Sequence, residues 1–324
     1  MSAGAPLLAD SLSGARRGAN AVAHYDALLR APGFGDARRP DLVIRAGDLP
    51  TSKPLRDWLA GLAGGTEQIA LEPEAVWADP DGVLSAVLPG DPVTTLSDAA
   101  FGAQELVAEP GWVQAWRTAD AAAAAAIDAT IGSGALNEPL IARTVAGALP
   151  SSATLFVASS MPVRELETFA AVRDDGPRVL CNRGANGIDG TIASALGVAA
   201  TGAPTTLLIG DVALAYDHSA LLAVSRLGLD LTVVVVDNGG GGIFDFLAVS
   251  GETDAYEHHV ATPTGLAAER IAALYGLEHV PVATAADLRA QLGRPGARLL
   301  HARTDRAGNV ELHRRVWAAV AAAL

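Results

Sequence analysis

The second half of the chain alternates short apolar runs with longer stretches that are typical of helices. The run "LTVVVVDN" (residues 231–238) contains four consecutive valines, as expected of a strand that is covered on both faces. Similar runs predict five further strands, over 154–160, 178–182, 205–211, 278–283 and 298–305. Helices are predicted between them, over 162–171, from about Gly190, over 213–228, and from about Asn309. This alternation predicts an α/β fold: a parallel six-stranded sheet with helices on both faces.

The first 134 residues show the same alternation more weakly. The pattern there predicts strands over 41–47 and 67–73, helices over 52–62 and an alanine-rich 120–132, and a linker at 132–139. This first region is short for a complete α/β domain. We therefore expect two domains, a small one over residues 1–134 and a complete one over residues 135–324, which agrees with the usual length prior for a chain of 324 residues.

Composition and charge narrow the class of protein. Half of the residues are hydrophobic and the formal net charge is −13, which argues against general binding to nucleic acid or to an anionic membrane. No apolar run is long enough for a convincing membrane span, and the N-terminus lacks the pattern of a secretory signal. Cys181 is the single cysteine, so an intrachain disulfide is excluded and a cytoplasmic location is expected.

Polar residues and glycines gather where two of the predicted strands end. Asp211 follows Gly210 at the end of one strand, and Asn238, 27 positions later, ends the next and is followed by four glycines. Ligands of parallel sheets bind beyond the carboxyl ends of the strands, where these residues can be neighbours. Carboxylate, amide and carbonyl oxygens suit Mg²⁺, and glycines and a helix N-terminus suit a diphosphate. The pattern therefore predicts a metal-bridged diphosphate.

Each part of this pattern has an ordinary interpretation when taken alone. A Gly-Asp pair at a strand end is most often a turn, and a run of glycines can be a flexible loop. The pair of strand ends at this spacing is much more specific than either part.

Further segments extend the pattern to a known family. The Asp211–Asn238 spacing resembles the thiamine diphosphate signature. Three segments, "ASSMPVRELETF" (158–169), "NRGANGIDGTIASALGVAA" (182–200) and "VVVDNGGGGIFDFL" (234–247), resemble one family of that superfamily, the 2-succinyl-5-enolpyruvyl-6-hydroxy-3-cyclohexene-1-carboxylate (SEPHCHC) synthases of the menaquinone pathway. The stretches "LADSLSG", "HYDALLR" and "PTSKPLRDWL" are similar to the middle domain of that family.

The resemblance implies an architecture and a reaction. Members have a pyrimidine-binding, a middle and a diphosphate-binding domain; residues 135–324 resemble the last, and residues 1–134 a middle domain without its first strand and helix. The pyrimidine-binding domain, which holds the glutamate that activates the cofactor, is expected to be missing, so the chain alone is expected to be inactive. The implied transferase uses thiamine diphosphate with Mg²⁺ or Mn²⁺. It decarboxylates 2-oxoglutarate, adds the resulting carbanion to isochorismate, and is a homodimer or homotetramer when complete.

The resemblance also implies roles for individual residues. Asp211, Asn238 and the carbonyl of Gly240 match the metal ligands. The cofactor-binding positions matched are Asn186, Gly187, Ile188, Gly210, Asp211, Val212, Asn238 and Gly240, with Ile188 supporting the bent cofactor. The substrate-binding or catalytic positions matched are Lys53, Ser159, Ser160, Arg164, Arg183, Ile243 and Phe244. The two arginines are expected to bind substrate carboxylates, since a guanidinium can pair with a carboxylate in bidentate fashion.

Three positions depart from the family pattern. Gly239 stands where a second asparagine is common, and Tyr216 and Thr264 stand where histidines are common. The first asparagine is the ligand, so the metal site is expected to persist, whereas substrate fit is left open at these positions.

Other functions remain alternatives at this point. One is a non-catalytic fragment that retains a remnant diphosphate and metal site. Another is a different 2-oxoacid decarboxylase or carboligase of the same superfamily. A nicotinamide-dependent oxidoreductase is the weakest, because no G-x-G-x-x-G follows the first strand of either half.

Overall fold

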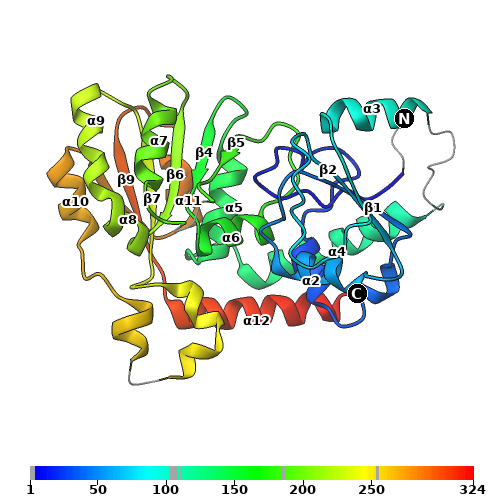
Figure 1. Ribbon diagram of the computed structural model, residues 1–324. Helices are drawn as coiled ribbons and strands as arrows, with labels where there is room; N and C mark the ends of the chain where they lie inside the picture. The colour runs from blue at the N-terminus through cyan, green and yellow to red at the C-terminus, as the bar shows by residue number, and fades with distance from the viewer. Residues whose placement is uncertain (1–3, 103–108, 110, 184–186, 253–254) are drawn as a thin grey trace. The chain divides into compact units, whose positions relative to one another are not determined.

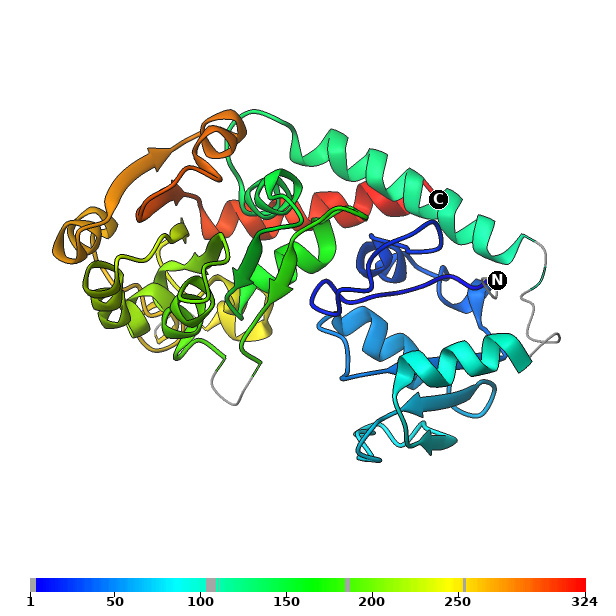
Figure 2. The ribbon, with the colours of Figure 1, turned by 90° about the horizontal axis from the view of Figure 1, so that it is seen from above.

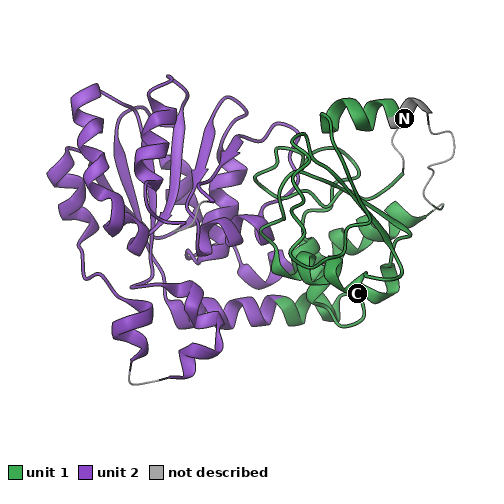
Figure 3. Ribbon diagram, viewed as in Figure 1, with its two compact units in different colours: residues 1–126, 317–324 green, residues 127–316 purple. Residues whose placement is uncertain are grey.

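The computed structural model describes residues 4–102, 109, 111–183, 187–252 and 255–324 (Figure 1). The chain divides into two compact units (Figure 3). Unit 1 contains residues 1–126 and 317–324, and unit 2 contains residues 127–316. The division into family domains at residues 134 and 135 stays a prediction.

The sheet of unit 2 has six strands, all parallel, in the order β5-β4-β6-β7-β9-β8. This confirms the predicted fold class. Residues 207–209 and 233–236 are buried throughout, as expected of central strands covered on both faces. The strands are β4 (Thr154–Val157), β5 (Arg178–Leu180), β6 (Thr205–Gly210), β7 (Thr232–Asp237), β8 (Glu278–Val282) and β9 (Arg298–Arg303).

Helices cover both faces of this sheet (Figure 2). On one face a single core joins strands and helices through residues such as Ile192, Leu207 and Val233, all fully buried. The helices that contribute to this core are α7 (Thr191–Ala199), α8 (Asp211–Asp217), α9 (Leu222–Leu227) and α10 (Ala268–Tyr275). Unit 2 also contains α5 (Glu138–Ala148), α6 (Met161–Phe169), α11 (Ala285–Gln291), the end of α4 (Trp112–Ile131) and most of α12 (Arg306–Ala322).

Two element predictions in unit 2 are wrong in detail. The single helix predicted over 213–228 is instead α8, a 3₁₀ turn over His218–Leu221, and α9. Two residues where α8 ends make long-range contacts. Asp217 Oδ2 accepts hydrogen bonds from two backbone N–H groups at the start of α7, and His218 Nδ1 lies 3.1 Å from the Tyr275 hydroxyl. The predicted linker at 132–139 ends early, because α5 begins at Glu138 with Asn137 as its N-cap. A proline in the first turn is compatible with a helix start.

Unit 1 contains a small parallel sheet of the order β1-β2-β3. Its aromatic core includes the fully buried Trp116 and Tyr25, with Phe34 edge-on to Trp116 at 5.3 Å between ring centroids. Ser52 caps α2 by accepting a hydrogen bond from the backbone N–H of Leu55. Its elements are α1 (Tyr25–Arg30), a 3₁₀ turn (Asp36–Arg38), β1 (Leu42–Ala46), α2 (Lys53–Gly61), β2 (Glu67–Leu71), β3 (Ala86–Leu88) and α3 (Pro92–Gly102), and α4 (Trp112–Ile131) begins there. Within the described residues, no helix has both the length and the apolarity to cross a membrane.

Candidate functional site

A cavity of about 390 Å³ lies in unit 2 at the carboxyl ends of β4, β6 and β7. In the sheet, β4 lies between β5 and β6. The chain runs from β4 to β5 on one side and then crosses to β6 on the other side, so the strand order reverses at β4. Open α/β sheets bind their ligands at such a reversal, because the loops that follow the two strands diverge and leave a crevice. The fold therefore places the cavity where a ligand is expected.

Asp211 is the first residue of α8 and lies directly beyond β6. Its carboxylate accepts a hydrogen bond from the backbone N–H of Gly240, so the ends of β6 and β7 meet as the sequence predicted. Burial, together with the nearby charge of Asp237, raises the pKa of Asp211 to about 6, even though backbone hydrogen bonds act to lower it. At neutral pH this carboxylate is ionised and partly buried, which favours a bound cation.

Asn238 lies one residue beyond β7 and has a polar atom that is not satisfied. Its Nδ2 donates to Oε1 of Glu138 at 2.8 Å. Its buried Oδ1 has no hydrogen-bond partner among the residues that the structure describes. Buried polar atoms are nearly always paired in native proteins, so an unpaired amide oxygen in a cavity indicates a missing ligand.

Gly240 packs closely against the backbone of Ala261. Its φ is +145°, and a Cβ there would lie 2.7 Å from the carbonyl oxygen of Ala261. The N–H of Gly241 donates to the same oxygen at 2.7 Å. Only glycine fits this position, because any side chain would clash with backbone.

These three residues fit the predicted metal. They offer one carboxylate, one amide oxygen and one backbone carbonyl, a set of hard oxygen donors that suits Mg²⁺ with phosphate oxygens or water completing the shell. Across the described ranges there is no group of three or more His, Cys, Asp or Glu side chains that could hold a metal ion. The donors named above are all oxygens, whereas zinc prefers nitrogen and sulfur ligands.

Two arginines also line the cavity. Arg164 donates from Nη1 to the carbonyl of Ser160 at 2.7 Å, and Arg183 donates to Oγ of Ser159 at 3.3 Å. Ser159 in turn donates to the carbonyl of Asn182 at 2.8 Å, which connects the ends of β4 and β5. In a chain of net charge −13, two cations on one cavity wall form a local anion-binding surface.

The backbone beside these arginines is unusual. Ser160 has φ +69° and ψ −135°, a conformation that a residue with a side chain adopts at a cost. Gly187 has φ +75°, and a Cβ on it would approach Cβ of Ser159 to 3.3 Å. Strain of this kind is common where a binding site dictates the backbone.

Most of the predicted site residues line this one cavity. They are Ser159, Ser160, Arg164, Arg183, Gly187, Ile188, Gly210, Asp211, Val212, Asn238, Gly240, Ile243 and Phe244. Asn186 lies outside the described residues. Lys53 belongs to unit 1, where it begins α2, is exposed and pairs with Asp57 at 2.6 Å, so its expected contact with substrate stays a prediction. Tyr216, Gly239 and Thr264, the three departures, are not among the described residues of the lining.

Among the polar residues that line this cavity, sequence reasoning missed three. Glu138 and Glu165 are buried carboxylates on α5 and α6, and Thr262 has a left-handed φ of +45°. Burial, together with the charge of Glu165, raises the pKa of Glu138 to about 8. The sequence around Glu138 signals a helix start, since an acid follows a capping asparagine and precedes the apolar "PLIA", but it does not signal a place in the site.

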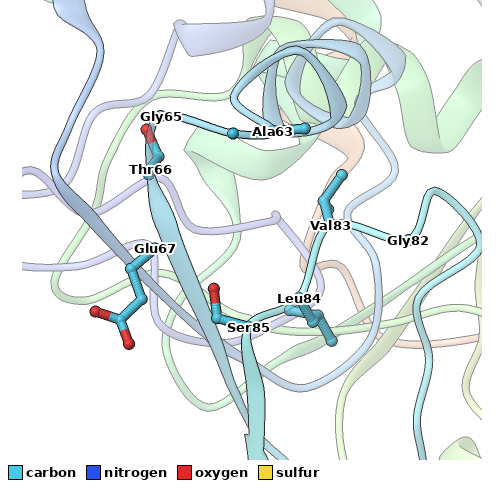
Figure 4. A pocket seen from close by; sticks show the side chains of 9 residues that line it. Ala63, Gly65, Thr66, Glu67, Gly82, Val83, Leu84 and Ser85 are labelled. Atoms are coloured by element: carbon cyan, nitrogen blue, oxygen red, sulfur yellow. The ribbon is translucent and has the colours of Figure 1, made fainter.

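A second hollow lies in unit 1, beside the start of β2 (Figure 4). It is more open than the cavity of unit 2, and Glu67 is the one charged residue in its described lining. It is lined by Ala63, Gly64, Gly65, Thr66, Glu67, Gly82, Val83, Leu84 and Ser85. Its described lining contains no asparagine and no arginine, unlike that of the cavity in unit 2.

Comparison with known proteins agrees with this chemistry. Residues 166–296 match the family described as "Thiamine pyrophosphate enzyme, C-terminal TPP binding domain". The matched region includes Asp211, Asn238 and Gly240, and it supports thiamine diphosphate with a divalent metal such as Mg²⁺ as the cofactors.

Curated relatives cover nearly the whole chain. It is 40% identical over 332 residues to the 2-succinyl-5-enolpyruvyl-6-hydroxy-3-cyclohexene-1-carboxylate synthase of Myxococcus xanthus, which covers 99% of this chain and 56% of the relative. The proteins of the same name from Rubrobacter xylanophilus and Bacillus velezensis are 38% and 35% identical, covering 97% and 95% of this chain and 55% of each relative. The chain thus spans about half the length of the curated relatives it matches.

Proposed function

We propose that the chain is the C-terminal portion of a thiamine diphosphate-dependent carboligase, a SEPHCHC synthase. The complete enzyme would decarboxylate 2-oxoglutarate and add the product to isochorismate. The observation that carries the proposal is the buried, unpaired Oδ1 of Asn238 beside the carboxylate of Asp211, which accepts the N–H of Gly240. A metal-bridged diphosphate satisfies all three residues at once.

The chain's own residues would divide the work between two ends of the cavity. Asp211, Asn238 and the carbonyl of Gly240 would hold the metal, and Ile188 would support the cofactor from the opposite side. Bound thiamine diphosphate supplies the electron sink for decarboxylation. Arg164 and Arg183 would orient the carboxylates of the substrates through charge-assisted hydrogen bonds. The apolar side chains of Ile243 and Phe244 would exclude water from the reacting carbon.

Calorimetric titration of the purified chain with thiamine diphosphate tests the cofactor part of the proposal. We expect weak binding with Mg²⁺ present and none with a chelator, because the diphosphate needs the bridging cation. Asp211→Asn should abolish the Mg²⁺-dependent part. Asp128→Asn is the matched control, since Asp128 is an exposed residue of unit 2 that pairs with Arg143. Equal binding with and without chelator would contradict the proposal.

Product formation by the chain alone tests whether the rest of the relatives' length is needed for activity. The relatives extend well beyond the region that this chain matches. We expect no product from 2-oxoglutarate and isochorismate, since the activating glutamate would come from the pyrimidine-binding domain. Measurable turnover by the purified chain would show that this domain is not required.

A further inference from the structure

Glu138 is a buried acid whose role the proposed function does not explain. It is the first residue of α5, is 3% exposed, and lines the cavity. A carboxyl group loses its hydration in such a place, so its hydrogen bonds must offset that cost.

One oxygen of Glu138 joins the ends of two strands. Oε1 accepts from Nδ2 of Asn238 at 2.8 Å and from Oγ1 of Thr304 at 3.2 Å. Asn238 follows β7, and Thr304 follows β9. The amide of Asn238 is also tightly packed, because a Cβ on Gly242 would lie 2.8 Å from Nδ2.

The two ends of an asparagine amide have nearly the same shape but opposite hydrogen-bonding character. Packing can therefore fix the plane of the amide without deciding which end points into the cavity. An acceptor placed against one end decides it, because only the NH₂ group can donate to that acceptor. The acceptor beside Asn238 is Glu138, and the end that remains unpaired is Oδ1.

We propose that Glu138 positions Asn238 as a metal ligand by holding its NH₂ group and so turning Oδ1 toward the cation. The inference rests on the proposed function and adds a residue to it. Glu138 does not itself contact the metal. Partners that orient a ligand in this way commonly change metal affinity by about 10- to 100-fold when they are replaced.

The role depends on the reach of an acceptor oxygen and not on a negative charge. A neutral carboxylic acid and a glutamine both present a carbonyl oxygen at the same distance from the backbone. An aspartate keeps the charge but withdraws the oxygen by one methylene. Methionine fills a similar volume and offers no comparable acceptor. These four side chains therefore separate reach from charge and from volume.

The test compares Mn²⁺ affinity in the presence of saturating thiamine diphosphate, followed by the electron paramagnetic resonance signal of free Mn²⁺. Glu138→Met and Glu138→Asp are expected to weaken Mn²⁺ binding by about 10- to 100-fold. Glu138→Gln should remain within roughly threefold of the unmodified chain, because its oxygen can still accept from Asn238. If Glu138→Met does not fold, the contrast between Asp and Gln decides.

Thr304→Val is the matched control. It removes a hydrogen bond to the same oxygen of Glu138 without touching Asn238. Urea unfolding without metal should show a loss of stability in Thr304→Val as in Glu138→Met. Mn²⁺ affinity should fall only in Glu138→Met, because only that variant releases the amide.

Each other outcome overturns the inference in a recognisable way. Equal Mn²⁺ affinity in all variants would leave the proposed function standing and remove the positioning role. A loss in Thr304→Val as large as that in Glu138→Met would show a general structural effect. A retained affinity in Glu138→Asp with a loss in Glu138→Gln would show that charge matters. If the unmodified chain bound no Mn²⁺ with thiamine diphosphate, the proposed function would fail together with the inference.

Discussion

At the scale of single residues, the candidate site consists of buried polar atoms that face a cavity. Asn238 Oδ1 is buried without a partner among the described residues, and Asp211 is partly buried beside a second carboxylate. Sequence spacing was enough to select these two residues, because both follow strands that the valine and leucine runs make obvious. Glu138 could not be found in this way, since its bond to Asn238 joins residues 100 positions apart.

Arg183 gives the first prediction at this scale, in a full-length enzyme that carries this chain as its C-terminal part. Arg183→Ala should lower kcat/KM by about ten- to a hundredfold or more, because a charge-assisted hydrogen bond contributes roughly 1.5–3 kcal/mol. Arg183→Lys should recover only part of the loss, since an ammonium lacks the planar fork. Steady-state kinetics with a thiamine diphosphate titration measures both effects.

Cofactor affinity should barely change in either Arg183 variant, since other residues hold the diphosphate. Arg178→Ala is the matched control: Arg178 is exposed and lies at the other end of β5. Near-normal kinetics for both Arg183 variants would mean that the side chain only lies at a solvated rim. Lost cofactor binding with normal substrate dependence would assign Arg183 to the diphosphate instead.

Ser160 gives a prediction about backbone strain. Its φ of +69° is unfavourable for any residue with a Cβ. Ser160→Gly should therefore raise the free energy of unfolding by about 1 kcal/mol, measured by urea denaturation. Ser160→Ala keeps the Cβ and should give no such gain. Equal stability of the Gly and Ala variants would show that the conformation is not strained.

At the scale of elements, the parallel sheet was predictable and the breaks in the helices were not. Runs such as residues 232–237 are apolar on both faces, so their burial follows from composition alone. The helical pattern over 213–228 continues without a proline or glycine until Gly228. Its interruption at His218 depends on contacts with α7 and Tyr275, which no local pattern encodes. Tertiary contacts therefore override local propensity here.

Asp217 gives the prediction for these elements. Its Oδ2 accepts from the backbone N–H groups of Ile192 at 2.6 Å and Ala193 at 3.0 Å, so it caps α7 from a distance. Asp217→Ala should lower the free energy of unfolding by about 1–2 kcal/mol, because two helix-terminal donors lose their partner. Urea denaturation measures the change. Asp189→Ala is the control, since Asp189 is exposed just before the same helix. An equal loss in both variants would contradict the capping role.

At the scale of the whole molecule, a pair of histidines links pH to stability. His279 Nε2 lies 3.3 Å from Nδ1 of His301, which in turn contacts Asp237 at 2.8 Å. Burial lowers the pKa of His279 below its usual 6.5, and His301 lowers it further. The folded state thus binds fewer protons than the unfolded state between the folded pKa and 6.5. This contribution to stability is complete above pH 6.5 and is lost as the pH falls through that window.

His279→Gln should therefore flatten the fall in the free energy of unfolding below pH 6.5. Urea denaturation at a series of pH values measures the slope. His258→Gln, at an exposed position, is the matched control. An unchanged slope in His279→Gln would show that other groups determine the acid sensitivity.

The central claim is that Asp211, Asn238 and the carbonyl of Gly240 together hold a metal-bridged diphosphate. The most direct measurement is an anomalous-difference map from crystals of this chain grown with Mn²⁺ and thiamine diphosphate, collected near the manganese absorption edge. We predict one strong peak within about 2.5 Å of all three donor oxygens, with the Asn238 oxygen facing it, at a distance typical of hard cation–oxygen contacts. A peak at other residues, or none at this cavity while the diphosphate is bound, would contradict the claim.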